Sequence, residues 1–153
     1  MDFALDDGTV YGTYTGKEWR ERRRLSAHLL SGGRSDRIHG NETGAKTPLV
    51  ETIWRRSQDW CCAPSDLWRF ADHSDEPVDL SWANWVGNQH GELCLRSWRD
   101  RLGLSQSAVG ESAGITRQRV SQLEASTGAI RLATIWRLAK ALGVPTGHLW
   151  RWA

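Results

Sequence analysis

Several residue types and patterns are scarce in this chain of 153 residues. It contains one methionine, two phenylalanines, two tyrosines and three cysteines. It has no run of about 18 apolar residues, the length that a membrane-spanning helix needs. The first ten residues, MDFALDDGTV, are acidic and lack the charged-then-apolar pattern of a secretion signal. The sequence therefore predicts a cytoplasmic protein with no membrane span.

The cysteines form no recognisable disulfide or metal-binding pattern. Cys61 and Cys62 are adjacent, which rarely permits a bridge between them, and no C-x-x-C spacing occurs. Together with His73 and His90 they can be drawn as zinc ligands, but this spacing matches no zinc-finger pattern. Cys94 is interpreted as a small buried or half-buried residue. We expect reduced thiols, no metal and no cofactor.

Tryptophan and arginine are abundant instead. The chain has 10 Trp, and the dominance of Arg over Lys, 17 to 3, is typical of a GC-rich genome rather than of a particular activity. Residues 91–153 contain nine Lys and Arg against four Asp and Glu, a net charge of +5, whereas residues 1–90 contain 11 against 14, a net charge of −3. A compact basic segment fits a partner with a phosphate backbone. The alternative is an ordinary solvated basic surface.

Residues 104–123, LSQSAVGESAGITRQRVSQL, predict two short helices joined by a tight turn. Ser105 and Thr116 are favourable N-caps, the first for a helix over residues 106–113. Gly114 stands where that helix must stop and the chain must turn sharply. The second helix carries arginine and glutamine on its open face, and these side chains can hydrogen-bond to base edges in a major groove. The segment therefore predicts DNA binding.

Over residues 93–150 the sequence resembles the Cro/repressor-type helix-turn-helix family, also called the XRE family. The matching positions stand at fixed spacing across four helices: Arg99, LGLSQ (102–106), Gly110, Glu124 and LAKALGV (138–144). In the family, the residues equivalent to Arg99 and Glu124 form an internal ion pair, and Gly110 lies where the second and third helices cross closely. The resemblance also implies an all-α fold, a five-helix lambda-repressor-like domain.

The sequence departs from this family after Glu124. The family usually continues with Asn-Gly and has a proline six residues after the glutamate. Here the glycine is displaced to position 128 and Ile130 replaces the proline. This leaves the conformation of the loop and its phosphate contacts open.

We expect a helix-turn-helix domain over residues 91–153. Its predicted helices are Glu92–Leu102, Gln106–Ala113, Thr116–Glu124, Leu132–Leu142 and a last short helix from Pro145 through Trp150. Each of the longer helices presents apolar residues at helical spacing, and together they can fill the core of a small domain.

Residues 1–90 contain short signals without a sustained period. They predict a strand or hairpin at 9–16, a basic helix at 17–30, a glycine-rich loop at 31–48, short helices at 50–60 and 64–73, and an acidic linker at 72–79. We interpret this region as a poorly ordered appendage. The alternative is a small core built from its tryptophans, whose spacing fits no repeat that we recognise. A further hypothesis is a start of translation at Val86, because a valine codon can initiate bacterial genes.

The candidate DNA-reading residues lie on the third helix. Arg117 and Gln118, in its first turn, are expected to point deepest into the groove, where Arg suits guanine and Gln suits adenine. The resemblance implies a phosphate contact by Gln106 at the start of the second helix. Further phosphate or groove contacts are expected from Thr116, Arg119, Ser121, Gln122 and Arg131. For each of them the alternative is a solvated surface side chain.

Three functions are compatible with these features. The first is a sequence-specific transcriptional regulator, a repressor, that binds double-stranded DNA as a homodimer; the dimer is inferred from the family's habit. The second is an antitoxin that regulates its own operon through the same helices and binds a toxin protein. The third is an enzyme whose N-terminal half is catalytic. Residues 1–90 show no nucleophile–base pattern, phosphate-binding loop or spaced carboxylate pair, so we expect no enzymatic activity.

Overall fold

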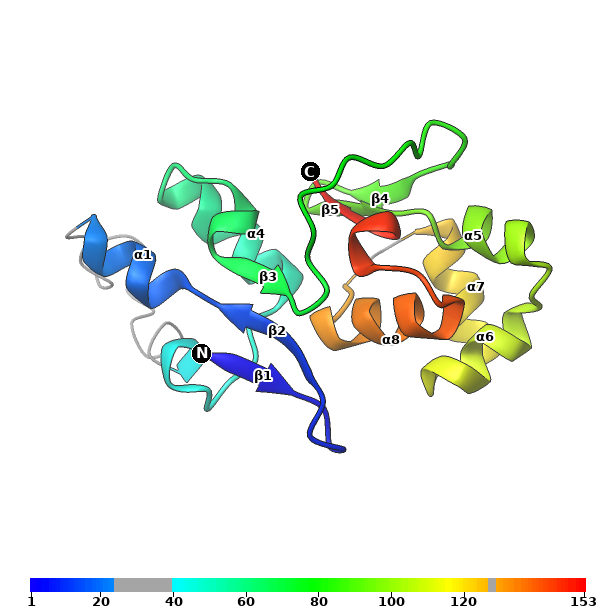
Figure 1. Cartoon of the computed structure of the whole chain (residues 1–153), viewed down its shortest axis with the longest axis horizontal. Helices are drawn as coiled ribbons and strands as arrows, with labels where there is room; N and C mark the ends of the chain where they lie inside the picture. Colours follow the sequence, from blue (N-terminus) through cyan, green and yellow to red (C-terminus); the bar gives the residue numbers. More distant parts are fainter. Residues whose placement is uncertain (24–39, 127–128) are drawn as a thin grey trace. The chain divides into compact units, whose positions relative to one another are not determined.

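The computed structural model describes residues 1–23, 40–126 and 129–153. They form two compact units, Met1–Ala71 and Asp72–Ala153, called here the N-terminal and the C-terminal unit. Each unit combines helices with a three-stranded antiparallel sheet (Figure 1). The chain is therefore mixed α/β, and the prediction of an all-α fold is wrong. Of the six strands in the described ranges, five have only three residues, too few for the alternating pattern by which a strand is recognised in sequence.

The N-terminal unit is built on a hairpin. Its elements are β1 (Asp2–Ala4), β2 (Val10–Tyr14), α1 (Gly16–Arg22), α4 (Val50–Asp59), the 3-10 helix η1 (Pro64–Asp66) and β3 (Trp68–Phe70). Strand β2 lies in the middle of the sheet, between β1 and β3. The predicted strand at 9–16 and the predicted helix at 50–60 are confirmed. The helix predicted at 64–73 is wrong, because the chain makes one 3-10 turn there and then joins the sheet.

Other predictions for this unit fall partly outside the described residues. α1 occupies the beginning of the helix predicted at 17–30, and residues 24–30 are not described. The predicted loop at 31–48 is described only from Gly40 onward, where residues 40–43 form one helical turn.

Tryptophan side chains form much of the core of the N-terminal unit. Trp68 of β3 is 1% exposed and lies against Phe3 and Tyr11, with ring centroids 5.8 Å away in each case. Trp19 of α1 stacks on Trp60 at the end of α4, with 5.8 Å between ring centroids and 6° between ring planes. Of the two interpretations of the N-terminal region, the described part of this unit corresponds to the small tryptophan core.

Cys61 adopts a backbone conformation that favours glycine. It follows α4, has φ 51°, and is the one non-glycine residue with positive φ among the described residues. In this conformation a residue with a Cβ atom is less stable than glycine by about 1–2 kcal/mol. A glycine variant loses about 0.5–1 kcal/mol of that advantage, because glycine gives up more conformational entropy on folding. We therefore expect Cys61→Gly to stabilise the unit by about 0.5–1 kcal/mol. Slower amide hydrogen exchange in peptides from residues 50–71 would show this.

The control for that substitution is Cys61→Ala, which removes the thiol and retains the Cβ atom. It is expected to give no gain. If both variants slowed exchange equally, the thiol rather than the backbone conformation would be responsible.

The C-terminal unit contains the predicted helices and a second sheet. Its elements are β4 (Val86–Asn88), β5 (Gly91–Leu93), α5 (Leu95–Leu102), α6 (Gln106–Ala113), α7 (Arg117–Ala125), α8 (Leu132–Leu142), the 3-10 helix η2 (Thr146–His148) and β6 (Trp150–Trp152). The helices predicted at 106–113 and 132–142 are confirmed. The first helix begins at Leu95 because residues 91–93 belong to β5. The predicted last helix is wrong: one 3-10 turn follows Pro145, and then β6 pairs with β5.

The helix boundaries of the C-terminal unit follow from local side-chain and backbone chemistry. The hydroxyl of Ser105 accepts a hydrogen bond from the backbone N–H of Ala108, which caps α6. Gly103, Gly114 and Gly143 end α5, α6 and α8 with φ between 67° and 71°, the left-handed conformation that glycine adopts at low cost. Short helices joined by tight turns result.

The core of the C-terminal unit gathers around α8. Leu132, Ile135 and Leu138 of this helix are fully buried, as are Val120 and Leu123 of α7. This apolar contact supplies most of the free energy that holds the short helices, which would be marginal alone. None of the helices in the described ranges has the length and apolar character that a bilayer span requires.

Two polar contacts join the ends of the C-terminal unit to its core. The carboxylate of Asp72 accepts hydrogen bonds from Lys140 Nζ (2.7 Å), Thr146 N (2.8 Å) and Thr146 Oγ1 (2.9 Å). The buried Cys94 thiol donates to the carbonyl of His148 at 3.2 Å. Burial raises the pKa of Cys94 to about 12, so the thiol stays protonated and continues to donate.

Candidate nucleic-acid interface

One face of α7 carries exposed polar side chains. Arg117, Gln118, Ser121 and Gln122 are all exposed. They lie at positions i, i+1, i+4 and i+5 of the helix, so they share one side of it. Val120, on the other side, is fully buried. The helix therefore packs by one face and presents hydrogen-bonding groups on the other.

The turn between α6 and α7 is packed directly against α6. A Cβ atom built on Gly110 would lie 2.8 Å from the carbonyl oxygen of Ile115, closer than real Cβ atoms approach a neighbour. Gly110 lies within α6, and its carbonyl accepts a hydrogen bond from the backbone N–H of Ile115 at 2.9 Å. The absence of a side chain here lets the two helices meet closely, as Figure 1 shows for α6 and α7.

The far end of α7 is held by a half-buried network of charged and polar side chains. Arg99 of α5 donates to both carboxylate oxygens of Glu124, with distances of 2.5 Å and 3.2 Å. The same guanidinium donates to the carbonyl of Leu104 at 3.1 Å, and the amide of Gln106 donates to Glu124 at 2.9 Å. The side chain of Glu124 is 7% exposed and that of Arg99 is 15% exposed. The network therefore connects α5, the start of α6 and the end of α7.

The network changes the ionisation of Glu124. Burial disfavours the charged carboxylate, but hydrogen bonds from Arg99 and Gln106 outweigh burial and lower the pKa of Glu124 below its usual value. A lowered folded-state pKa means that the ionised carboxylate stabilises the fold above its unfolded-state pKa, which is about 4.3. This stabilisation is lost as the pH falls through the folded-state pKa.

Replacing Arg99 with methionine is expected to remove this pH dependence. At pH 7 the variant should lose about 1–3 kcal/mol, because a buried acceptor is left unsatisfied. On acidification from about pH 5 the wild-type stability should fall, whereas the contribution of Glu124 in the variant should change little, because burial is then opposed by the hydrogen bond from Gln106 without the bonds from Arg99. Urea unfolding at pH 7 and at pH 4 measures both effects.

Arg101→Met, on the exposed side of the same helix, controls for the loss of one positive charge. It should retain the wild-type pH profile. Identical profiles for the wild type and Arg99→Met would show that the Arg99–Glu124 pair contributes nothing to stability.

Comparison with known proteins identifies the family to which the helices of the C-terminal unit are similar. Residues 95–149 match a family model described as Helix-turn-helix. The C-terminal unit contains a helix-turn-helix domain. The match supports a DNA-binding regulator of the XRE type. No curated protein and no solved structure matches the chain.

The predicted site residues of the helix-turn-helix domain fall into two groups. In the described part of the chain, the side chains of Arg117, Gln118 and Gln122 have no hydrogen-bonding or ion-pair partner. Of the others, Gln106, Thr116 and Arg119 are engaged within the domain, and Ser121 and Arg131 are exposed. The hydroxyl of Thr116 caps α7, and Arg119 donates to the carbonyl of Ala129 at 2.8 Å. The first group is thus free to contact a ligand.

The remaining predicted residues lie at the start of α6, on the exposed face of α7 and directly before α8. The side chain of Gln106 is turned to Glu124, while its backbone forms the first residue of α6. Ser121 lies on the exposed face of α7, and Arg131 is the exposed residue that precedes α8. Sequence reasoning did not anticipate the bonds made by the Gln106 amide and by Arg119; a carboxylate and a loop carbonyl 10 to 18 residues away leave no local signal.

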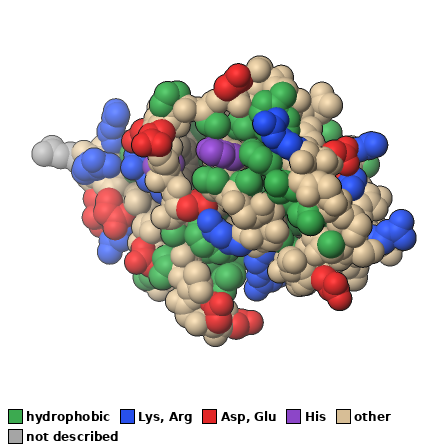
Figure 2. Space-filling view, turned by 45° about the vertical axis from the view of Figure 1, so that its right-hand side comes forward, with side chains coloured by type: hydrophobic (Ala, Val, Ile, Leu, Met, Phe, Trp, Pro, Cys, Tyr) green, Lys and Arg blue, Asp and Glu red, His purple; other side chains and the backbone are tan. Residues whose placement is uncertain are grey.

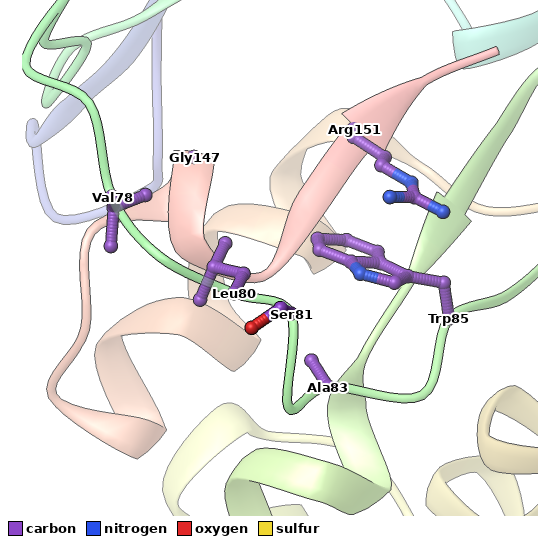
Figure 3. Close-up of a pocket in the computed structure, with 7 residues that line it drawn as sticks. All are labelled: Val78, Leu80, Ser81, Ala83, Trp85, Gly147 and Arg151. Atoms are coloured by element: carbon purple, nitrogen blue, oxygen red, sulfur yellow. The ribbon is translucent and has the colours of Figure 1, made fainter.

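On the face seen in Figure 2, the Lys and Arg side chains of the described residues are interspersed with hydrophobic, acidic and other polar groups. The C-terminal unit also has a surface hollow of about 460 Å³ beside β6 (Figure 3). At its wall the guanidinium of Arg151 stacks 4.2 Å from the centre of the Trp85 ring. None of its lining residues belongs to α6 or α7. The exposed face of α7 therefore remains the candidate interface.

Proposed function

We propose that this protein is a sequence-specific transcriptional repressor that inserts α7 into the major groove of double-stranded DNA. The observation that carries this proposal is the face of α7 on which Arg117 and Gln118 are exposed and without partners among the described residues. An α-helix fits the major groove, and its first-turn side chains reach furthest toward the bases.

The base-reading roles follow from side-chain chemistry. Arg117 offers paired donors that match O6 and N7 of guanine, and Gln118 offers a donor and an acceptor that match N6 and N7 of adenine. Gln122 lies one turn further along the same face and reaches a base edge or a phosphate. Because these side chains are not tied to the protein, base contacts would replace only water.

The phosphate contacts would come from the margins of the helix pair. The backbone N–H groups at the start of α6 point out of the helix and attract a phosphate, and Gln106 is the first residue there. Ser121, Arg119 and Arg131 lie on or next to α7, and Thr116 stands at its start. Such contacts set the position of the protein on the duplex and do not select a base.

Selection of duplexes from a random-sequence pool by the full-length protein tests the proposal. We expect enrichment of a defined sequence, and repression of a reporter gene when that sequence overlaps its promoter. Failure to enrich any sequence would refute specific DNA binding. Enrichment with activation of the reporter would refute the repressor role alone. Enrichment together with specific binding of the product of an adjacent toxin gene would favour the antitoxin alternative.

A further inference from the structure

We propose that residues 1–23 and 40–71 repeat, in diverged form, the hairpin, first helix, last helix and final strand that frame the helix-turn-helix of the C-terminal unit, and that one chain therefore brings two such frames to one DNA site. The second part of this inference rests on the proposed function. The first part rests on a comparison of the two units with each other, residue by residue.

The two sheets have the same topology, and their second and third strands pair in the same register. In each unit a hairpin is followed by a helix, and the last strand of the unit pairs with the second strand of the hairpin. The cross-strand partners are Gly12–Phe70, Thr13–Arg69 and Tyr14–Trp68 in the N-terminal sheet, and Gly91–Trp152, Glu92–Arg151 and Leu93–Trp150 in the C-terminal sheet. Residues of β2 and β5 are 79 positions apart (12 to 91), and residues of β3 and β6 are 82 positions apart (70 to 152).

The ion pair of the C-terminal unit has a counterpart in the N-terminal unit. Arg20 of α1 donates Nε and Nη2 to the two carboxylate oxygens of Glu42, with both distances 3.0 Å. By the same offsets, Arg20 corresponds to Arg99 (20 + 79) and Glu42 to Glu124 (42 + 82). The two pairs also have similar exposures: 18% and 7% for Arg20 and Glu42, against 15% and 7%. A half-buried, fork-shaped ion pair at equivalent positions is not expected of unrelated folds.

The final helix of each unit and the strand after it repeat in sequence as well as in structure. TIWR occurs at 52–55 and at 134–137, and LWR follows after the same interval, at 67–69 and 149–151. The isoleucine of each TIWR and the leucine of each LWR are fully buried. The same backbone hydrogen bond is also present in both units. The residue before the first helix donates its N–H to the carbonyl of the LWR leucine: Thr15 to Leu67 at 2.9 Å, and Cys94 to Leu149 at 3.0 Å.

Local details that are unrelated to one another also coincide. A Cβ atom on Gly12 would lie 2.1 Å from Cζ2 of Trp68, and one on Gly91 would lie 2.2 Å from Cζ2 of Trp150. Both glycines are therefore required by the indole ring that lies across them.

The left-handed residue in the turn that follows the last helix shows the same correspondence. Cys61, with φ 51°, occupies the place of Gly143, with φ 69°. The left-handed conformation of a cysteine is explained if the chain inherited this turn from a unit with glycine there. The N-terminal unit also has the glycine and the proline that are missing after Glu124, since Gly44 and Pro48 stand two and six residues after Glu42.

Counted with its C-terminal cap residue, the first helix of each unit has the same net charge. Residues 17–23 contain four basic and two acidic side chains, and residues 96–102 contain three basic and one acidic, so both segments have a net charge of +2. In the N-terminal unit Lys17 and Arg22 are exposed. The frame and the charge that would bring the C-terminal unit to a phosphate backbone are thus present twice. A homodimer is then not needed to place two units on one site.

The number of chains on a DNA site tests this inference. The probe is the duplex that the full-length protein selects from a random-sequence pool, and native mass spectrometry counts the chains on it. We expect one chain per duplex, two separate blocks of selected sequence, and a loss of at least tenfold in affinity when one block is removed. Two chains per duplex, or one chain on a single block, would overturn the inference while the proposed function stands. No enrichment of any sequence would overturn both.

Charge reversal in the N-terminal unit gives an independent measurement. The variant Lys17→Glu with Arg22→Glu should bind the selected duplex more weakly and with a smaller salt dependence, by about 2 in the slope of log K against log salt. The matched control, Arg55→Glu with Arg69→Glu, makes the same change of charge at exposed positions on α4 and β3. It should retain the wild-type slope, and an equal decrease in both variants would overturn the inference. Near-ultraviolet circular dichroism of the tryptophans checks that both variants are folded.

Discussion

Replacing Gly91 with valine is expected to abolish the cooperative folding of the C-terminal unit. Its Cβ atom would lie 2.2 Å from Cζ2 and 2.4 Å from Cη2 of Trp150, and 2.9 Å from the carbonyl oxygen of Arg151. Trp150 is only 4% exposed, so its ring has no free space to move into. Displacing it forfeits about as much as deleting it, roughly 3–5 kcal/mol, which is a large part of the 5–15 kcal/mol that stabilises a typical domain.

Thermal unfolding measured by tryptophan circular dichroism would show the loss. Gly147→Ala is the matched control, since nothing lies within 4 Å of a Cβ atom at that position of the same unit. It should leave the transition near that of the wild type. If the valine variant of Gly91 unfolded at the wild-type temperature, the packing of Trp150 across β5 would be wrong.

Replacing Arg117 with alanine is expected to weaken binding to the selected DNA site by a factor of about 10 to 100. A bidentate contact to guanine contributes about 1–3 kcal/mol of discrimination, and tenfold in affinity corresponds to about 1.4 kcal/mol. Because Arg117 is exposed and has no partner among the described residues, the substitution should not alter stability. Preference for one base pair should relax at the same time, and fluorescence anisotropy with duplexes substituted at each position measures both effects.

Arg137→Ala controls for the loss of one positive charge, on α8 rather than on α7. It should lower affinity slightly and equally for all duplexes, without changing base preference. Unchanged affinity and preference in Arg117→Ala would refute the base-reading role. A uniform loss over all duplexes would instead make Arg117 a phosphate contact.

The helix-turn-helix domain could be located from sequence because its signals are local. Ser105 and Gly114 delimit α6 by capping chemistry that acts within a few residues, and Gly143 ends α8 in the same way. The exposed face of α7 follows from helical periodicity once its start at Thr116 is known. These features need no knowledge of the rest of the fold.

The strands could not be located because their signals are not local. β6 has only three residues, Trp150–Trp152, and is a strand because β5 offers it a partner nearly 60 positions earlier in the chain. Pro145 correctly indicated a new turn, but only the paired edge of β5 decides whether a helix or a strand follows. Context of this kind regularly overrides local preference in strands.

The repeat was present in the sequence but at a spacing that a search for short periods misses. The Trp-Arg pairs that begin at Trp19, Trp54 and Trp68 recur at Trp98, Trp136 and Trp150, at distances of 79, 82 and 82 residues. The change from 79 to 82 reflects three additional residues between the first and the last helix of the C-terminal unit. Aligning the two halves of the chain with one gap, rather than inspecting each half alone, would have shown the relation.

The shared register of the two sheets has a consequence for how the chain reaches its native state. A strand with the sequence of β3 meets the pairing requirements of β5 as well as those of β2, and the same is true of β6. Exchange of equivalent strands is a characteristic misfolding route of proteins built from repeated domains. Phe70 and Trp152 differ at the position opposite the glycine, as do the loops of the two hairpins. We expect these differences to disfavour exchange of the two strands, so that divergence between the halves protects the fidelity of folding.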